Sequence, residues 1–195
     1  MTIHRPALVL ALLAANLLST GCVPLVVGGA AATAAVALDR RTAGTVLEDQ
    51  ATEMRIRSAF ADVPGLREQT HINVTCYNGV VLLSGESPTE ALRSQAGDIA
   101  HNSEKVRSVH NEIQIAAPSA TMSRTSDAYI TSKVKTSLLN VKVKGFDPLR
   151  VKVVTENGTV FLMGLVTREE SDATTDVTRE VGGVQRIVKL FEVID

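Results

Sequence analysis

The sequence predicts an α+β protein built from two tandem copies of one small domain, each with the element order αββαβ. Two stretches, residues 72–85 and 151–164, carry this prediction, because each has alternating apolar residues on both sides of an Asn-Gly pair. Such a pair is the strongest short-range signal for a β-hairpin with a two-residue type I′ turn. Two hairpins of the same design therefore indicate two copies of one domain.

The turn fixes the register of each hairpin. Tyr77 must face Val80 across the first turn, and side chains then alternate between the two faces of the sheet. One face of each hairpin should carry the core: Ile72, Val74, Cys76, Val81 and Leu83 in the first copy, and Val151, Val153, Thr155, Val160 and Leu162 in the second.

Two helical patterns and a third strand surround each hairpin. In the first domain, residues 46–115, we expect a helix from Glu48 that ends before Pro64. Ser87 and Glu90 have capping-box spacing, which predicts that Ser87 is the N-cap of the second helix. A third strand at 106–115 should close this domain, and a linker at 116–123 follows. In the second domain, residues 124–195, we expect a helix from 126 to about 141, a helix from Thr167 and a closing strand at 186–194. Each domain should hold a three-stranded mixed sheet with two helices on one face.

The N-terminus has the parts of a bacterial export signal. Arg5 precedes an apolar run, residues 7–18, and this run leads to Gly21-Cys22, which resembles a lipobox. We therefore expect residues 1–21 to be a lipoprotein signal peptide and Cys22 to carry the lipid anchor.

The next segment, residues 22–45, is predicted to be a lipidated tether rich in Ala and Gly. An uncleaved transmembrane anchor is the alternative, because residues 23–38 are also apolar, but Gly28 and Gly29 make a poor lipid-facing helix.

An Asp after the acylated Cys favours the inner membrane in Gram-negative bacteria. Val23 stands there, so we expect an outer-membrane protein with its domains in the periplasm.

The search for catalytic chemistry predicts that the protein is not an enzyme. His71, His101 and His110 are scattered over different elements, and no nucleophile motif or Gly-rich phosphate loop accompanies them. We expect no metal, no cofactor and no small-molecule substrate.

With Cys22 acylated, Cys76 should be a small core residue without a redox role. Residues 46–115 hold 6 basic and 10 acidic side chains, which argues against nucleic acid as a partner.

The repeated unit resembles the BON domain. The resemblance rests on the Asn-Gly hairpin, the Gly after its second strand, and a closing strand with Val106, Val109, Asn111 and Ile113. The second copy departs from this pattern at Lys189, which replaces the Asn. Two such domains behind a lipobox resemble the dual-BON outer-membrane lipoproteins. The resemblance implies a non-enzymatic protein that binds anionic phospholipid through its second domain and supports envelope integrity, partly at division sites.

The first helix of the second domain is the predicted binding element. Ile130, Val134 and Leu138 share one face, which should be the core face, whereas Tyr129 and Leu139 should point outward. Exposed apolar side chains bordered by lysines are typical of a helix that lies in a lipid headgroup layer. The predicted phospholipid-binding residues are Tyr129, Ser132, Lys133, Lys135, Thr136, Leu139, Lys142 and Lys144.

The equivalent helix of the first domain keeps the basic residues, as Arg55 and Arg57, but has Ala51 and Ala61 in place of the two apolar side chains. Three alternatives remain at this point. Tyr129 could instead cover a contact between the domains, and the lysines could be an ordinary solvated face. The third strands or the other face of the sheet could dock a protein such as an outer-membrane assembly component. The chain could also be a spacer between membrane and cell wall.

Overall fold

The structure, a computed structural model, describes residues 39–118 and 121–194, which belong to one compact unit. The predicted signal peptide, Cys22 and most of the predicted tether lie outside the described residues. No helix in the described part of the chain has the length and apolarity needed to cross a bilayer.

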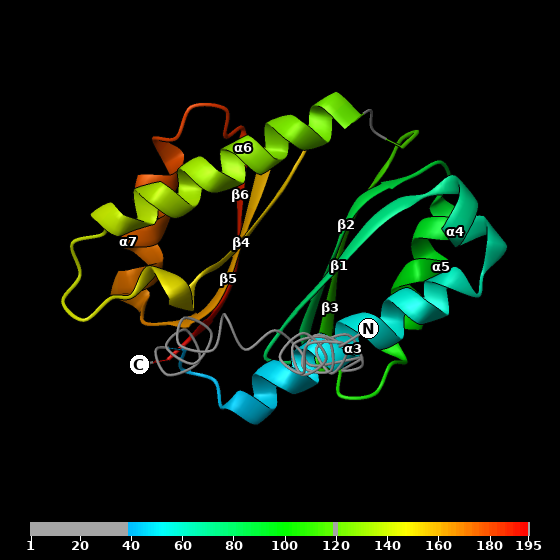
Figure 1. The fold of residues 1–195 in the computed structure, drawn as a ribbon, viewed down its shortest axis with the longest axis horizontal. Helices are drawn as coiled ribbons and strands as arrows, with labels where there is room; N and C mark the ends of the chain where they lie inside the picture. Colours follow the sequence, from blue (N-terminus) through cyan, green and yellow to red (C-terminus); the bar gives the residue numbers. More distant parts are fainter. Residues whose placement is uncertain (1–38, 119–120, 195) are drawn as a thin grey trace, which may run out of the picture. The chain divides into compact units, whose positions relative to one another are not determined.

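The first domain has the predicted order of strands and helices, with one additional short helix (Figure 1). Its elements are α3 (Ala43–Ala61), α4 (Pro64–Gln69), β1 (His71–Tyr77), β2 (Val80–Ser87), α5 (Glu90–His101) and β3 (Ser108–Ile115). The sheet order is β1-β2-β3, with β1 antiparallel and β3 parallel to the central strand. Helices α3 and α5 cover one face of this mixed sheet, as predicted (Figure 1).

The second domain repeats this arrangement. Its elements are α6 (Thr121–Ser137), the 3-10 turns η2 (Leu138–Asn140) and η3 (Pro148–Arg150), β4 (Lys152–Glu156), β5 (Thr159–Val166), α7 (Arg168–Arg179) and β6 (Arg186–Val193). The sheet order β4-β5-β6 has the same mixture of antiparallel and parallel pairing. The predicted α+β class, with two mixed three-stranded sheets, is confirmed.

The hairpin predictions are confirmed in register and in turn type. Tyr77 pairs with Val80 and Cys76 with Val81. Both turn residues of each Asn-Gly pair have positive φ, 52° at Asn78 and 74° at Gly79, as a type I′ turn requires.

Several predicted helix ends were wrong. Helix α3 begins at Ala43, because the Thr42 side chain accepts a hydrogen bond from the backbone of Thr45 and caps the helix before Glu48. Ser87 is the last residue of β2, and Thr89 is the N-cap of α5. Helix α6 begins at Thr121, inside the predicted linker and five residues before the predicted start, and it gives way to a 3-10 turn after Ser137. The capping box of Thr167 and Glu170 is confirmed.

A buried aspartate on the first helix of each domain holds the hairpin turn. The carboxylate of Asp127 accepts hydrogen bonds from the backbone N–H groups of Asn157 and Gly158, both at 2.9 Å. Asp49 does the same for Asn78 and Gly79, at 2.6 and 2.8 Å. Both aspartates are at most 6% exposed, so each turn is tied to its helix by charge-assisted bonds.

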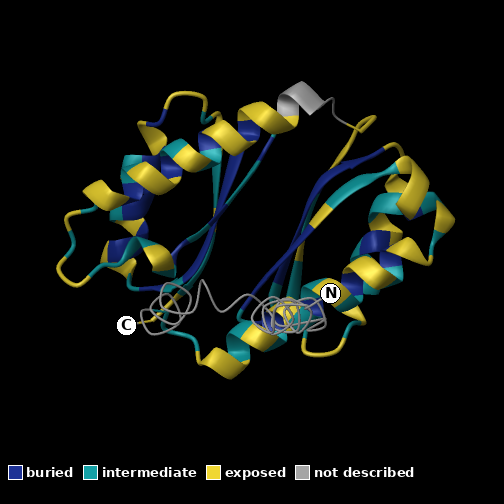
Figure 2. Ribbon diagram, in the orientation of Figure 1, coloured by how far each residue is buried: buried dark blue, intermediate teal, exposed yellow. Residues whose placement is uncertain are grey.

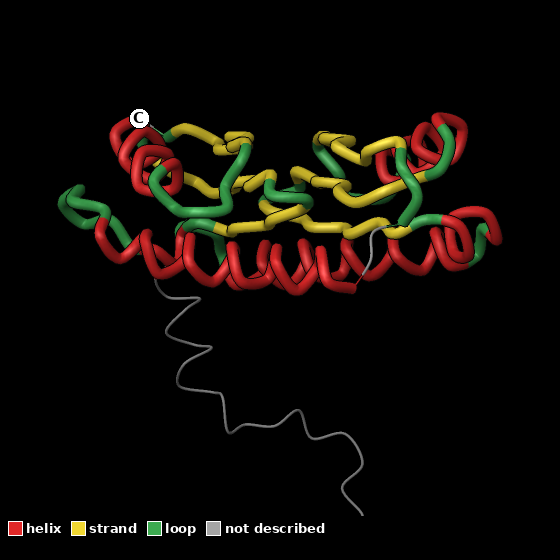
Figure 3. The backbone as a smooth tube through the Cα atoms, turned by 90° about the horizontal axis from the view of Figure 1, so that it is seen from above, coloured by secondary structure: helices red, strands yellow, loops and turns green. Residues whose placement is uncertain are grey.

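The central strand of each sheet, β2 or β5, is buried on both faces, whereas the third strands β3 and β6 are mostly half-buried or exposed (Figure 2). The face predicted for the core packs against the helices, with Val81 and Val160 fully buried. The other faces of the two sheets meet in a separate cluster formed by Tyr77, Leu82, Phe161 and Met163. In Figure 1 the two sheets accordingly lie between helices α6 and α7 on one side and α4 and α5 on the other, and Figure 3 shows the strands in the middle with a row of helices along one side.

We predict that Asp127→Asn lowers the free energy of unfolding by about 2 kcal/mol, because one acceptor oxygen is replaced by an amide that cannot accept from the turn. Urea unfolding at pH 7 measures the change. Asp176→Asn is the matched control, since this aspartate is exposed on α7 and should change stability by less than about 0.5 kcal/mol. Equal effects of the two substitutions would contradict the role given to Asp127.

Candidate functional site

The outward face of α6 exposes the two apolar side chains that the helical pattern placed there. Tyr129 is 66% exposed and Leu139 is 71% exposed, whereas Ile130, Val134 and Leu138 belong to the core. Tyr129 therefore does not cover the contact between the domains, and that alternative is wrong.

Leu139 reaches the surface through the 3-10 turn η2. The turn η3 adds a further exposed apolar side chain, Leu149, at 58%, which sequence reasoning missed because the segment reads as a loop. Leu139, Pro148 and Leu149 line a depression of about 430 Å³ together with Lys135. A second depression on the other side of α6 is lined by Tyr129 and Lys133. Arg41 and Lys152 also line the first hollow, which is therefore positively charged, whereas the second hollow includes Glu180 beside Lys133.

The lysines of this face fall into two groups. The Nζ atom of Lys133 donates to the carbonyl of Gly182 at 2.6 Å and lies 5.3 Å from the centre of the Tyr129 ring, which fixes its position. Lys135, Lys142 and Lys144 are exposed, and no carboxylate of the described residues lies within ion-pair distance of them. Their positive charge is therefore available to an external anion.

Ser132 and Thr136 are exposed between the apolar side chains, but their hydroxyls donate to α6 itself. Ser132 donates to the carbonyl of Ala128 and Thr136 to that of Ser132, both at 3.0 Å. They can still accept hydrogen bonds from a ligand, and their small size leaves room beside Tyr129.

The equivalent helix α3 differs in its charges rather than in its exposure of apolar residues. Arg55 pairs with Glu48, and Arg57 pairs with Glu53, both at 2.9 Å, so these arginines are already neutralised. Leu47 and Met54 are 66% and 68% exposed on this helix. They lie at positions other than Ala51 and Ala61, which are the equivalents of Tyr129 and Leu139. Exposed apolar side chains occur on both helices, but on α6 and in the residues that follow it they are combined with lysines that have no carboxylate partner among the described residues.

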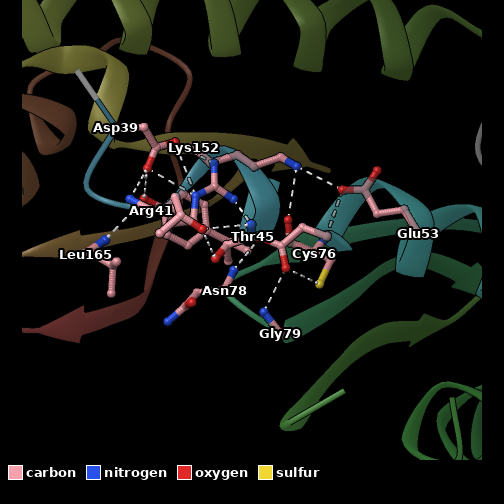
Figure 4. Close-up of polar contacts among 12 residues, drawn as sticks. Asp39, Arg41, Thr45, Glu53, Cys76, Asn78, Gly79, Lys152 and Leu165 are labelled. Carbon is pink, nitrogen blue, oxygen red and sulfur yellow. Dashed lines mark hydrogen bonds and ion pairs between the residues drawn. The ribbon is translucent and has the colours of Figure 1, made fainter. Parts of the chain in front are cut away.

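The segment before α3 is held to both domains, although the sequence predicted a tether there. The Arg40 guanidinium binds the Glu170 carboxylate through two nitrogens and the carbonyl of Leu165. Arg41 pairs with Asp39 and Asp49 and lies over the Tyr77 ring, 3.7 Å from its centre (Figure 4).

Two carboxylates of this region have a pKa below the ordinary value. Burial raises the pKa of Glu170, but hydrogen bonds from Arg40 and the backbone of Thr167 outweigh it, and the net pKa is lowered. Burial likewise raises the pKa of Glu53, and its bonds to the Cys76 backbone and to Lys152 lower it overall (Figure 4). Both carboxylates are ionised at neutral pH and join elements of the two domains.

Cys76 lies in the core of the first domain, as predicted. Its side chain is 1% exposed and its thiol donates to Asp49 at 3.2 Å. Burial, with the neighbouring Asp49 carboxylate, raises the pKa of the thiol to about 12. The thiolate, which is the reactive form, is therefore almost absent at neutral pH.

One histidine is brought together with carboxylates from distant parts of the sequence. His71 lies beside Glu86 and Glu156, whereas the sequence predicted three unrelated histidines. Burial raises the pKa of Glu156, and the neighbouring Glu86 carboxylate adds to this. The three residues come from both domains, so no sequence spacing could have grouped them.

A family model for the BON domain matches residues 48–117 and again residues 126–195. The chain therefore belongs to the BON-domain family and carries two copies of the domain. "Outer membrane lipoprotein DolP" of Haemophilus influenzae is 34% identical to it over 94% of both chains. "21 kDa hemolysin" of Actinobacillus pleuropneumoniae is 36% identical over 80% of both. "Osmotically-inducible protein Y" of Escherichia coli is 29% identical over 74% of this chain and 72% of that one.

We predict that Cys76 reacts with a thiol reagent at pH 8 about 100-fold more slowly in the folded protein than in urea, because it is both buried and protonated. The measurement uses Cys22→Ser, in which Cys76 is the one cysteine of the chain. Labelling of the native protein at the unfolded rate would contradict the burial of this thiol.

We also predict that Glu170→Gln lowers stability at pH 7 by about 2 kcal/mol, because Arg40 loses a charged partner. The folded pKa of Glu170 lies below its ordinary value of 4.5, so this stabilisation is complete above pH 4.5 and disappears as the pH falls through the lowered pKa. Unfolding curves of the two proteins should therefore converge in acid. The exposed neighbour Glu169 supplies the control, Glu169→Gln, and curves that stay parallel down to acidic pH would exclude the proposed ion pair.

Proposed function

We propose that this protein is an outer-membrane lipoprotein, anchored through Cys22 and without enzymatic activity, whose second domain binds anionic phospholipid such as phosphatidylglycerol. One observation carries the proposal: exposed Tyr129 and Leu139 lie beside lysines that have no carboxylate partner among the described residues. The similarity to the lipoprotein of Haemophilus influenzae supports the location. Support of envelope integrity, including at division sites, is part of the same proposal.

The energies fit weak binding that is strengthened by an anchor. Each lysine near an anionic membrane contributes about 1 kcal/mol, and salt reduces this. Inserting Tyr129 and Leu139 adds a few kcal/mol at about 25 cal/mol per Å² of apolar surface. Alone, these contributions give a weak surface site. An acyl anchor raises the local concentration of the domain at the membrane, so a weak site suffices.

The competing proposal, docking of an envelope protein on the sheets, has less support. The other face of each sheet is occupied by the partner domain, with Leu82 and Phe161 at most 2% exposed. Two ion pairs, Arg107–Glu192 and Arg186–Glu112, also connect residues at the third strands of the two domains. A protein partner would have to use another surface.

The test is co-sedimentation of residues 39–195 with vesicles, with lipid charge and salt varied. Both domains are needed, because an isolated second domain would expose Phe161 and Met163 and bind lipid non-specifically. We predict that binding to phosphatidylglycerol vesicles falls at least about tenfold when Tyr129→Ser and Leu139→Ser are combined, since both insertions are lost.

The matched control is Leu47→Ser with Met54→Ser on α3, which removes equally exposed apolar surface next to paired arginines and should leave binding unchanged. Binding should also weaken as salt is raised. Equal binding of the parent protein to purely zwitterionic vesicles, or equal loss in both double variants, would refute the proposal.

A further inference from the structure

A compact group of potential metal ligands lies where the two domains meet. One ligand atom from each of His71, Glu86 and Glu156 lies within 4.8 Å of the others. His71 and Glu86 belong to the first domain, at the start of β1 and near the end of β2, and Glu156 ends β4 of the second domain. The group thus spans the domain contact.

The two carboxylates are deeply buried and are oriented by the opposite domain. Glu86 is 1% exposed and Glu156 is 4% exposed. The Asn157 side chain donates to Oε1 of Glu86 at 2.7 Å, and the Asn73 side chain donates to Oε2 of Glu156 at 2.9 Å. Hydrogen bonds of this kind, from outer residues to a carboxylate, fix metal-ligating carboxylates in position.

His71 supplies the nitrogen that such a cation would need. Its Nδ1 atom is buried and has no hydrogen-bond partner among the described residues. It lies 3.4 Å from Oε2 of Glu86. Two ligand atoms of a tetrahedral zinc ion, with bonds of about 2.1 Å, lie about 3.4 Å apart. His71 and Glu86 therefore already have the separation of two ligands, and the Glu156 carboxylate, within 4.8 Å of both, would move closer to become the third.

Solvent can reach this group. The His71 side chain is 24% exposed, and it lines a depression of about 370 Å³ with Glu156, Asp127 and Arg124. The Asp127 carboxylate is committed to the hairpin turn. Arg124 of α6 lines the same depression, and its positive charge would repel a bound metal ion.

We propose that His71, Glu86 and Glu156 bind one divalent transition-metal ion of the zinc class, which links the two domains. One imidazole nitrogen and two carboxylate oxygens suit zinc better than magnesium or calcium, which take oxygen ligands. With a neutral imidazole, the ion balances the charge of the two carboxylates, and water can fill its fourth position. Because its ligands come from both domains, binding stabilises their contact.

The experiment titrates zinc chloride into the full chain, purified in detergent and treated with a chelator, and follows heat release and thermal unfolding. We expect one zinc ion per chain and a Tm increase of about 5–10 °C when free zinc is near 100 times its Kd. Magnesium should produce no shift. His71→Gln and Glu156→Gln should each weaken zinc binding at least about tenfold, since each removes one ligand.

The control is His110→Ala, which removes an exposed histidine of β3 and should leave zinc binding unchanged. Glu156→Gln decides the matter if His71→Gln does not fold, because glutamine keeps the size of the side chain and can still accept from Asn73. Absence of zinc binding by the parent chain, or unchanged binding by Glu156→Gln, overturns the proposal. If the parent chain does not bind zinc and Glu156→Gln raises the metal-free Tm at pH 7, the proposal is overturned in favour of two carboxyls that share a proton.

Discussion

Contact between the outer faces of the two sheets determines which surfaces of this protein remain available. Leu82 and Met163 are fully buried there, with Tyr77 and Phe161 beside them. Each small domain therefore buries both faces of its central strand, and the apolar area that it could not bury alone contributes to stability. The helices carry much of the remaining surface, and the proposed lipid site is accordingly on a helix. The same contact brings His71 of one domain to Glu156 of the other.

The two copies have kept the interactions that form the fold and have diverged on their outward helices. Asp49 and Asp127 hold their hairpin turns with the same pair of backbone hydrogen bonds. A turn with two residues at positive φ leaves its N–H groups in need of acceptors, and a buried carboxylate satisfies both. On the outward faces, by contrast, the α3 arginines are paired with glutamates, whereas Lys135 and its neighbours on the second domain are not. Electrostatics, more than exposed apolar surface, distinguishes the two helices.

The charged residues at the domain contact also position the start of the folded chain. Arg40 binds Glu170 of the second domain immediately before α3 of the first domain begins. An arginine that bridges a carboxylate through two nitrogens has a defined direction, because the guanidinium is planar. The first described residues of the chain are thus held against both domains. Sequence reasoning missed this restraint, since Asp39, Arg40 and Arg41 read as a short charged stretch with no periodicity.

The sequence alone determined the repeat, the hairpin register, the type I′ turns and the outward direction of Tyr129, because alternation, Asn-Gly turns and helical spacing act over a few residues. It misplaced the caps at Thr42 and Thr89, where several Ser and Thr residues could accept the same backbone bond. Only the tertiary structure decided that the sheets pack together, that Arg55 is neutralised and Lys135 is not, and that His71 lies beside Glu86 and Glu156. The sheet contact and the group around His71 join side chains far apart in the chain, which meet only when complete domains pack, whereas Arg55 and Glu48 are seven residues apart on α3.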